Sequence, residues 1–97
     1  MTPSDFMNVV RFKLKPDCVG KYFEEIKRCE FQGMKKRYIA KTSNYEYCFV
    51  GIWESADAIA AKRPAMIAQL NKVRVFMEEL SPELGVTEPI SEKIVAL

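Results

Sequence analysis

"YCFVGIWES" (residues 47–55) is the most apolar run of the chain and holds its only tryptophan, Trp53. Successive residues of a strand point to opposite faces of a sheet, and in this run both sets are apolar. A strand of that kind is typical of the centre of a sheet that is covered on two sides. Ser55 is a residue type that caps helix N-termini. The run therefore predicts a central strand over Glu46–Trp53 that leads directly into a helix.

The sequence before this run predicts two further strands and one helix. Residues 8–14 alternate between apolar and polar side chains, as a half-buried strand does. Over residues 18–29 apolar side chains recur at helical spacing, and Asp17 is placed to cap that helix. The extended segment after Gly33 is basic, which suits an edge strand that is protected from aggregation by its charge.

The sequence after the run predicts a helical region and one last strand. Ser55 caps a first short helix, and Pro64 begins a second one, because proline is best tolerated in the first turn of a helix. In the second helix the apolar residues recur at intervals of three and four and form a stripe: Met66, Leu70, Val73, Met77 and Leu80. The turn-forming residues 81–85 end this helix, and Pro89 marks the start of the last strand.

The resulting order, β-α-β-β-α-β, predicts an α+β, ferredoxin-like sandwich in which both helices cover one face of the sheet. We expect one such domain over residues 1–97. The bare face of the sheet would carry these side chains from the first and third strands: Val9, Arg11, Lys13, Cys48, Val50 and Ile52. Because a bare apolar face is sticky, we expect a homodimer through this open face, with Arg11 inside or at the mouth of the shared barrel. The alternative is a monomer with a mildly apolar exposed sheet.

The composition argues against several classes of function. The net charge of +2 is too small to imply binding to nucleic acid or to a membrane, and no apolar run is long enough to span a bilayer. No secretory signal pattern is visible, and the three cysteines form no CxxC motif, so we expect a cytoplasmic protein with reduced thiols. The chain has no histidine, the commonest general base and metal ligand. We therefore expect no metal, and because the four glycines form no phosphate-binding loop, we expect no other cofactor either.

Four short motifs occur in the order of a known family: "FKLKPD", "GM", "FVGIWESADAIAA" and "RPAM". Together they resemble the antibiotic biosynthesis monooxygenase family of the dimeric α/β barrels, over about residues 8–95. The W-E-S step at residues 53–55 is the most specific of these elements. The resemblance implies a dimer of ferredoxin-like subunits with a small-molecule pocket between sheet and helices. Some members of that family oxidise aromatic polyketides with O₂ and without metal or flavin, and others degrade haem.

The functional residues of that family are only partly present. Its quinone-forming members have an asparagine four residues before the tryptophan, a tyrosine six residues after it and an arginine on the following helix. Trp53 matches, but the other three positions hold Phe49, Ile59 and Leu70. The haem-degrading members need a histidine on the second helix, and because this chain has none, haem degradation is not expected.

Five residues are candidates for contact with a bound molecule: Asn8, Tyr47, Phe49, Trp53 and Met66. The indole N–H of Trp53 suits an oxygen of an aromatic ligand, or the ring fills the core with its N–H bonded to a carbonyl. Tyr47 and Phe49 share its face by the two-residue period of a strand. Asn8 faces the helices and either has a buried hydrogen-bond partner or lies at the wet end of its strand. Met66 belongs to the helical stripe, which is core or pocket wall. No catalytic residue is assigned.

Two other features have both a functional and a structural interpretation. Cys18 lies in the first turn of a helix, where the helix dipole makes a thiol more reactive, or it is a cysteine without chemical role. The basic residues Lys35, Lys36, Arg37 and Lys41 attract an anionic ligand, or they protect an edge strand.

Three functions are compatible with the sequence. The first is a dimeric small-molecule-binding protein of the cofactor-independent monooxygenase type, with an aromatic or polyketide-type substrate and an unidentified general base. The second is a non-catalytic dimer that binds a small apolar ligand or serves a partner protein. The third is an RNA-recognition motif, which has the same strand order. Residues 45–52 lack its basic residue, glycine and last aromatic, so a nucleic-acid partner is not expected.

Overall fold

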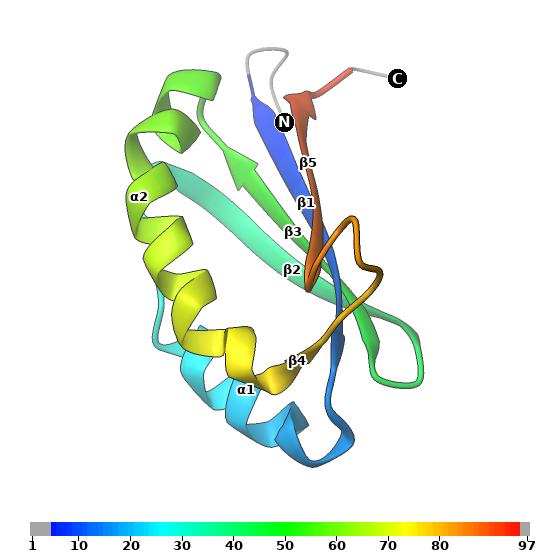
Figure 1. The fold of residues 1–97 in the computed structure, drawn as a ribbon. Coiled ribbons are helices and arrows are strands. Elements are labelled where there is room, and N and C mark those ends of the chain that lie inside the picture. The colour runs from blue at the N-terminus through cyan, green and yellow to red at the C-terminus, as the bar shows by residue number, and fades with distance from the viewer. Residues whose placement is uncertain (1–4, 96–97) are drawn as a thin grey trace.

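The helices and strands follow the order predicted from the sequence (Figure 1). The computed structural model describes residues 5–95. Its elements are β1 (Phe6–Leu14), the 3-10 turn η1 (Pro16–Cys18), α1 (Val19–Lys27), β2 (Met34–Ser43), β3 (Glu46–Trp53), α2 (Ala56–Val73), the 3-10 turn η2 (Arg74–Phe76), β4 (Met77–Glu78) and β5 (Thr87–Lys93). The α+β, ferredoxin-like sandwich is therefore confirmed.

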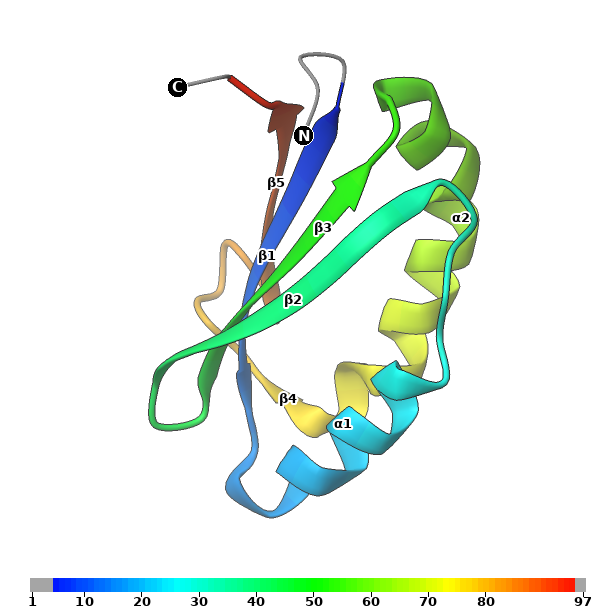
Figure 2. The ribbon, with the colours of Figure 1, turned by 180° about the vertical axis from the view of Figure 1, so that it is seen from behind.

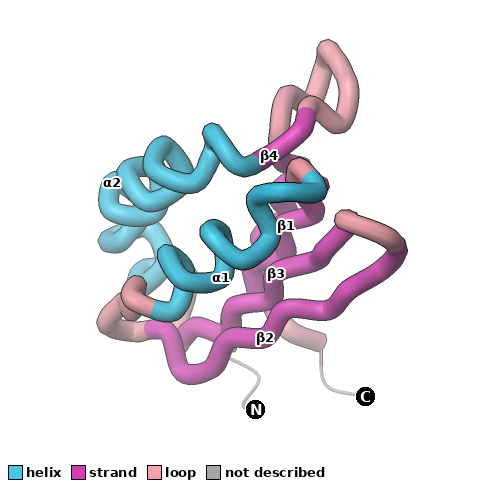
Figure 3. The backbone as a smooth tube through the Cα atoms, turned by 90° about the horizontal axis from the view of Figure 1, so that it is seen from below, coloured by secondary structure: helices cyan, strands magenta, loops and turns pink. Residues whose placement is uncertain are grey.

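The strands form one antiparallel sheet in the order β2-β3-β1, and both β4 and β5 pair with the far edge of β1 (Figure 2). β3 is central and β2 is the edge strand, as predicted. Figure 3 shows that α1 and α2 lie on the same side of the sheet. The sheet thus has an inner face toward the helices and an outer face that no element among residues 5–95 covers.

The prediction of two short helices around Pro64 is wrong, because α2 runs without a break from Ala56 to Val73. The backbone N–H of Ala58 donates to the Ser55 Oγ at 3.1 Å, so the expected cap is present. Proline in a helix interior removes one backbone hydrogen bond and crowds the carbonyl of the preceding turn, so other interactions must offset its cost. Ile59 before it and Val73 after it are both buried, and this packing holds the helix together across the proline.

Three boundary predictions also need correction. The apolar stripe leaves the helix after Val73, so that Met77 lies in β4 and Leu80 in the loop that follows. Asp17 lies within η1 and does not cap α1, whose N-cap residue, Cys18, makes no side-chain capping hydrogen bond. β5 begins at Thr87 rather than at Pro89, which lies inside the strand. A proline fits there because β5 pairs with β1 alone and needs no second ladder.

Aromatic side chains fill one end of the space between the sheet and the helices. The Phe12 ring lies 5.0 Å from the Tyr22 ring and 5.8 Å from the Tyr47 ring. Phe23 closes the group at 5.6 Å from Tyr47, in an edge-to-face arrangement. Leu14 is fully buried beside them. This packing ties β1, α1 and β3 together at one end of the molecule.

The outer face of the sheet carries one apolar row across four strands. The register pairs Tyr38 with Val50, Val50 with Val9, and Val9 with Ile90. The two end members of the row are exposed, Tyr38 by 55% and Ile90 by 56%. The open apolar face that the sequence predicts is therefore present.

Candidate functional site

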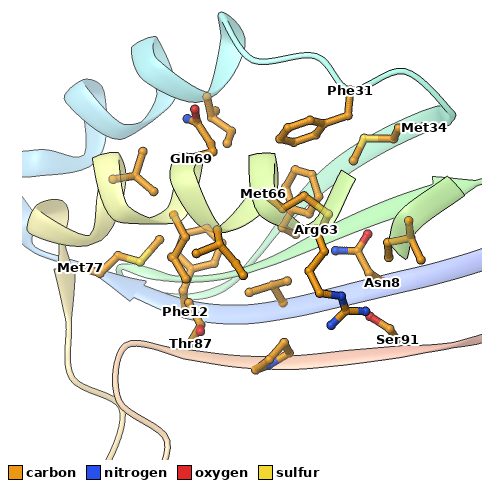
Figure 4. A pocket seen from close by; sticks show the side chains of 18 of the residues that line it. Asn8, Phe12, Phe31, Met34, Arg63, Met66, Gln69, Met77, Thr87 and Ser91 are labelled. Atoms are coloured by element: carbon orange, nitrogen blue, oxygen red, sulfur yellow. The ribbon is translucent and has the colours of Figure 1, made fainter. Parts of the chain in front are cut away.

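A cavity of about 270 Å³ lies between α2 and the inner face of the sheet (Figure 4). β1 contributes Asn8, Val10 and Phe12 to its wall, and the same face of β5 contributes Thr87, Pro89 and Ser91. These residues lie opposite one another because β1 and β5 pair with Asn8 against Ser91 and Phe12 against Thr87. The lining is mostly apolar, and the volume is close to the lower end of the range of about 300–1,000 Å³ for ligand pockets.

One continuous face of α2 forms the opposite wall. Ile59, Arg63, Met66, Leu70 and Val73 follow at intervals of four, three, four and three residues, and all five line the cavity. This is the spacing of one helical stripe. Sequence reasoning missed the first two members because it began the second helix at Pro64 and the stripe at Met66. Extending the same period backwards through the proline would have found both.

A buried hydrogen bond supports the floor of the cavity. The Trp53 Nε1–H donates to the Asn8 Oδ1 at 2.8 Å, and Asn8 is only 3% exposed. Trp53 is fully buried, and its ring stacks at 6.2 Å on the ring of Phe31, which lines the cavity. Trp53 itself lies behind the wall. Of the two interpretations of Trp53, the geometry supports the structural one. The ring fills the core, and its N–H is bonded to the side-chain carbonyl of Asn8.

Gly51 makes this hydrogen bond possible. It pairs with Asn8 across β1 and β3, two residues before Trp53. A Cβ atom at residue 51 would lie 2.4 Å from the Asn8 Oδ1 and 3.1 Å from the Trp53 Nε1. Only a residue without a side chain leaves room for the pair, which gives Gly51 a structural role that its place in a strand did not reveal.

Few groups in the wall can do acid–base chemistry. Burial raises the pKa of the Tyr22 hydroxyl well above its ordinary range, and the nearby Arg37 guanidinium offsets this only in part. Tyr22 therefore stays neutral at physiological pH and is a poor general base. Among the described residues that line the cavity, Arg63 is the single charged side chain. The buried Gln69 Nε2 has no hydrogen-bond partner among the residues that the structure describes.

The five predicted site residues separate into two groups. Asn8, Phe49 and Met66 line the cavity, whereas Tyr47 and Trp53 do not. Tyr47 points along the same face but packs into the aromatic group beside Phe12. The cavity also has wall residues that sequence reasoning did not consider: Phe31, Met34, Arg63, Gln69 and Ser91.

Other candidate features have structural partners. The Cys18 Sγ donates to the Asp17 Oδ1 at 3.6 Å, and Cys18 is buried. Arg37 donates to the backbone oxygens of Ile26, at 2.9 Å, and of Cys29, and so satisfies carbonyls at the end of α1.

The basic segment is partly neutralised by an acidic partner. Its Lys35 forms an ion pair of 3.1 Å with Asp5, so at least this residue of the segment already has a partner.

Over residues 5–95 no group of three or more acidic or cysteine side chains is arranged to hold a metal ion. No helix in this part of the chain is long and apolar enough to cross a membrane.

Neither a family model nor a curated protein matches this sequence, but solved structures match its fold. SnoaB, a cofactor-independent oxygenase from Streptomyces nogalater, superposes in a variant form with a TM-score of 0.73 and 12% identity, over 97% of this chain and 96% of that one. A Caulobacter crescentus protein assigned to the antibiotic biosynthesis monooxygenases reaches 0.74 at 13% identity, over 97% and 92% of the two chains. A dimeric ferredoxin-like protein from an uncultured marine organism reaches 0.69 at 11%, over 97% and 90%. This chain therefore has the fold that antibiotic biosynthesis monooxygenases share with other dimeric ferredoxin-like proteins.

Proposed function

We propose that this protein binds a small apolar or aromatic molecule in the cavity between α2 and the sheet. One observation carries the proposal. The three positions at which the family resemblance implies an asparagine, a tyrosine and an arginine hold Phe49, Ile59 and Leu70, and all three line the cavity. The pocket of the fold is thus kept while three polar groups are replaced by apolar ones. Such a wall favours burial of an apolar ligand over acid–base catalysis.

We also propose that the protein forms a homodimer through the outer face of the sheet. The row Tyr38, Val50, Val9 and Ile90 supports this, because its exposed ends leave apolar surface in contact with water. Two sheets packed face to face about 10 Å apart would bury that row. The mass measured by light scattering at micromolar concentration tests the assembly, and a monomer mass contradicts it.

The first test of ligand binding is native mass spectrometry of the purified protein, which detects a retained small molecule directly. Isothermal titration calorimetry with 2-naphthol then measures binding of a known aromatic probe. Met66→Trp places a larger side chain in the cavity and is expected to abolish this binding. Ala65→Trp is the matched control, because Ala65 is exposed on the same helix and does not line the cavity. Equal affinity in all three proteins would overturn the proposed site.

Cofactor-independent oxygenation is the second candidate function. It is favoured by the similarity to the fold of SnoaB and by the Asn8 amide at the floor of the cavity. A suitable test is uptake of O₂ with anthrone, in which one O₂ converts the methylene group to a carbonyl and releases one water. Uptake above the buffer rate that is lost in Asn8→Ala and Trp53→Phe would establish an oxygenase. If the protein binds the probe but shows no uptake of O₂, only the binding function is supported.

A further inference from the structure

We propose that the ligand of this cavity carries a carboxylate, which the guanidinium of Arg63 binds at the solvent-facing edge of the wall. The inference rests on the proposed binding function and narrows the ligand from any apolar molecule to a small apolar acid. It is carried by the position of Arg63, by its lack of a protein partner, and by the polar groups around it.

Arg63 belongs to the cavity wall although it is an exposed residue. It lies one helical turn after Ile59 and one turn before Met66 on the same face of α2. Figure 4 shows its side chain extending from α2 toward Ser91 on β5. Arginine commonly packs its aliphatic stem on apolar surface while its charged end stays at the water boundary. The guanidinium is thereby placed at an edge that a ligand in the cavity can reach.

The guanidinium has no partner to compete with a ligand. Within residues 5–95 the Arg63 side chain makes no hydrogen bond and no ion pair, and no acidic side chain lines the cavity. Arg11, by contrast, pairs with Glu88, and Arg37 binds the carbonyls at the end of α1. All five N–H donors of Arg63 are therefore available for an acceptor. The planar fork of a guanidinium matches the two oxygens of a carboxylate.

Neutral polar groups beside Arg63 fit the same ligand. Asn8 and Ser91 face each other across β1 and β5, and both line the cavity on the side toward which Arg63 extends. They offer hydrogen bonds without adding charge. A single positive charge balances a monoanion, whereas a phosphate dianion would keep an unbalanced charge against an apolar wall. A carboxylate is accordingly favoured over a phosphate.

Gln69 indicates how long the ligand is. Its buried Nε2 lacks a partner among the described residues and lies in the wall six residues after Arg63. Six residues correspond to about 9 Å along a helix axis. Figure 4 shows the two side chains leaving α2 in different directions, so a ligand that meets both groups is at least this long. A two-ring aromatic acid with an oxygen at its far end is a suitable probe. 6-Hydroxy-2-naphthoic acid has this arrangement, and its amide, 6-hydroxy-2-naphthamide, is a neutral match of the same shape.

The test is isothermal titration calorimetry of both compounds with the intact protein. We expect the wild-type protein to bind the acid about tenfold more tightly than the amide, which is the usual size of one charge-assisted contact. Arg63→Gln should lose about five- to tenfold in affinity for the acid, since the side chain is partly screened by water, and should bind the amide unchanged. Lys72→Gln removes a charge from an exposed site of the same helix outside the cavity and should change neither affinity.

Each outcome separates this inference from the proposed function. If the wild-type protein binds neither compound, both are overturned. If it binds both equally, or if Arg63→Gln leaves the preference intact, the cavity remains a ligand site and only the carboxylate is overturned. An equal loss in Lys72→Gln shows a general charge effect and also overturns it. The preference for acid over amide is measured first in the unaltered protein, and unchanged binding of the amide by Arg63→Gln shows that this variant is folded.

Discussion

The two ends of the space between helices and sheet are built differently from the same strands. At one end the rings of Phe12, Tyr22 and Tyr47 lie within 6 Å of a neighbouring ring and fill the volume, and Phe12 and Tyr22 also form the boundary of this packed end with the cavity. At the other end β1 carries Asn8 in place of a large ring, and α2 stands over a cavity of about 270 Å³. One end holds the elements together, and the other leaves room for a ligand.

This difference shows that stability and binding are divided along the length of β1. The strand turns Asn8, Val10, Phe12 and Leu14 toward the helices, and only the last two lie in the buried cluster. Protein interiors are packed densely, and voids larger than a water molecule are few, so a space of this size sets the hollow end apart from an ordinary core. We expect substitutions at the filled end to change stability and those at the hollow end to change binding.

The largest expected effect compares two leucines. Leu14→Ala at the filled end should lower the free energy of unfolding by about 3 kcal/mol, because Leu14 is fully buried and its loss leaves a new hole. Leu70→Ala should cost only about 1 kcal/mol, because Leu70 is half-buried and loses about half of the burial free energy of a core leucine, and because it already borders a cavity. Urea unfolding followed by circular dichroism measures both. Equal losses would show that the two ends do not differ in packing.

A second comparison uses two glycines. Gly51→Ala should cost about 1–3 kcal/mol, because its Cβ atom must displace the Asn8 Oδ1 from the Trp53 N–H. Gly20→Ala is the control: Gly20 is helical, nothing lies within 4 Å of its added Cβ, and alanine should stabilise by about 0.5–1 kcal/mol.

Thermal unfolding with the fluorescence of Trp53 as the signal measures both changes. A shift of the emission in the folded Gly51→Ala protein would report the lost hydrogen bond directly. If Gly51→Ala were as stable as the wild-type protein, the close approach would have no energetic consequence.

The sequence predicted the fold well and the site only in part, for reasons that particular residues make clear. The alternating pattern of β1, the continuous apolar run of β3 and the cap at Ser55 are local signals, and all three were found. The cavity depends on the straight passage of α2 through Pro64, which packing at Ile59 and Val73 decides and no local rule contains. The hydrogen bond of Trp53 to Asn8 joins residues 45 positions apart and could be anticipated only as a need for some partner.

A smaller effect concerns the pH dependence of the filled end. Burial raises the pKa of Tyr22 above its ordinary value of 10.0, so the folded protein keeps a proton that the unfolded chain releases. The contribution of Tyr22 to stability is thus complete below pH 10 and falls as the pH rises above it, by up to about 1.4 kcal/mol per pH unit.

Urea unfolding from about pH 9 to pH 11 measures this dependence. Other groups titrate in the same window, so the comparison is with Tyr22→Phe, which keeps the ring and removes the hydroxyl. The loss of stability with pH should be shallower in the variant by the stated slope. Parallel curves for the two proteins would mean that the hydroxyl ionises as readily in the fold as in water.

The smallest expected effect lies on the outer face, where Arg11 donates to Glu88 at 2.6 Å from its Nε atom. Both side chains are about half exposed in the single chain, at 48% and 37%, and such pairs contribute at most about 1 kcal/mol. Arg11→Gln should therefore cost about 0.5 kcal/mol in urea unfolding of the monomer, and Lys13→Gln, which breaks the similar pair with Glu78, should cost no more.

The proposed dimer changes this expectation for Arg11. It places Arg11 inside or at the mouth of an interface, where removal of the guanidinium leaves Glu88 without a partner. A loss that is larger for Arg11→Gln than for Lys13→Gln, and that depends on protein concentration, would locate the interface at this face. A small loss that is independent of protein concentration would indicate that Arg11 stays exposed to water, and would contradict a dimer through this face.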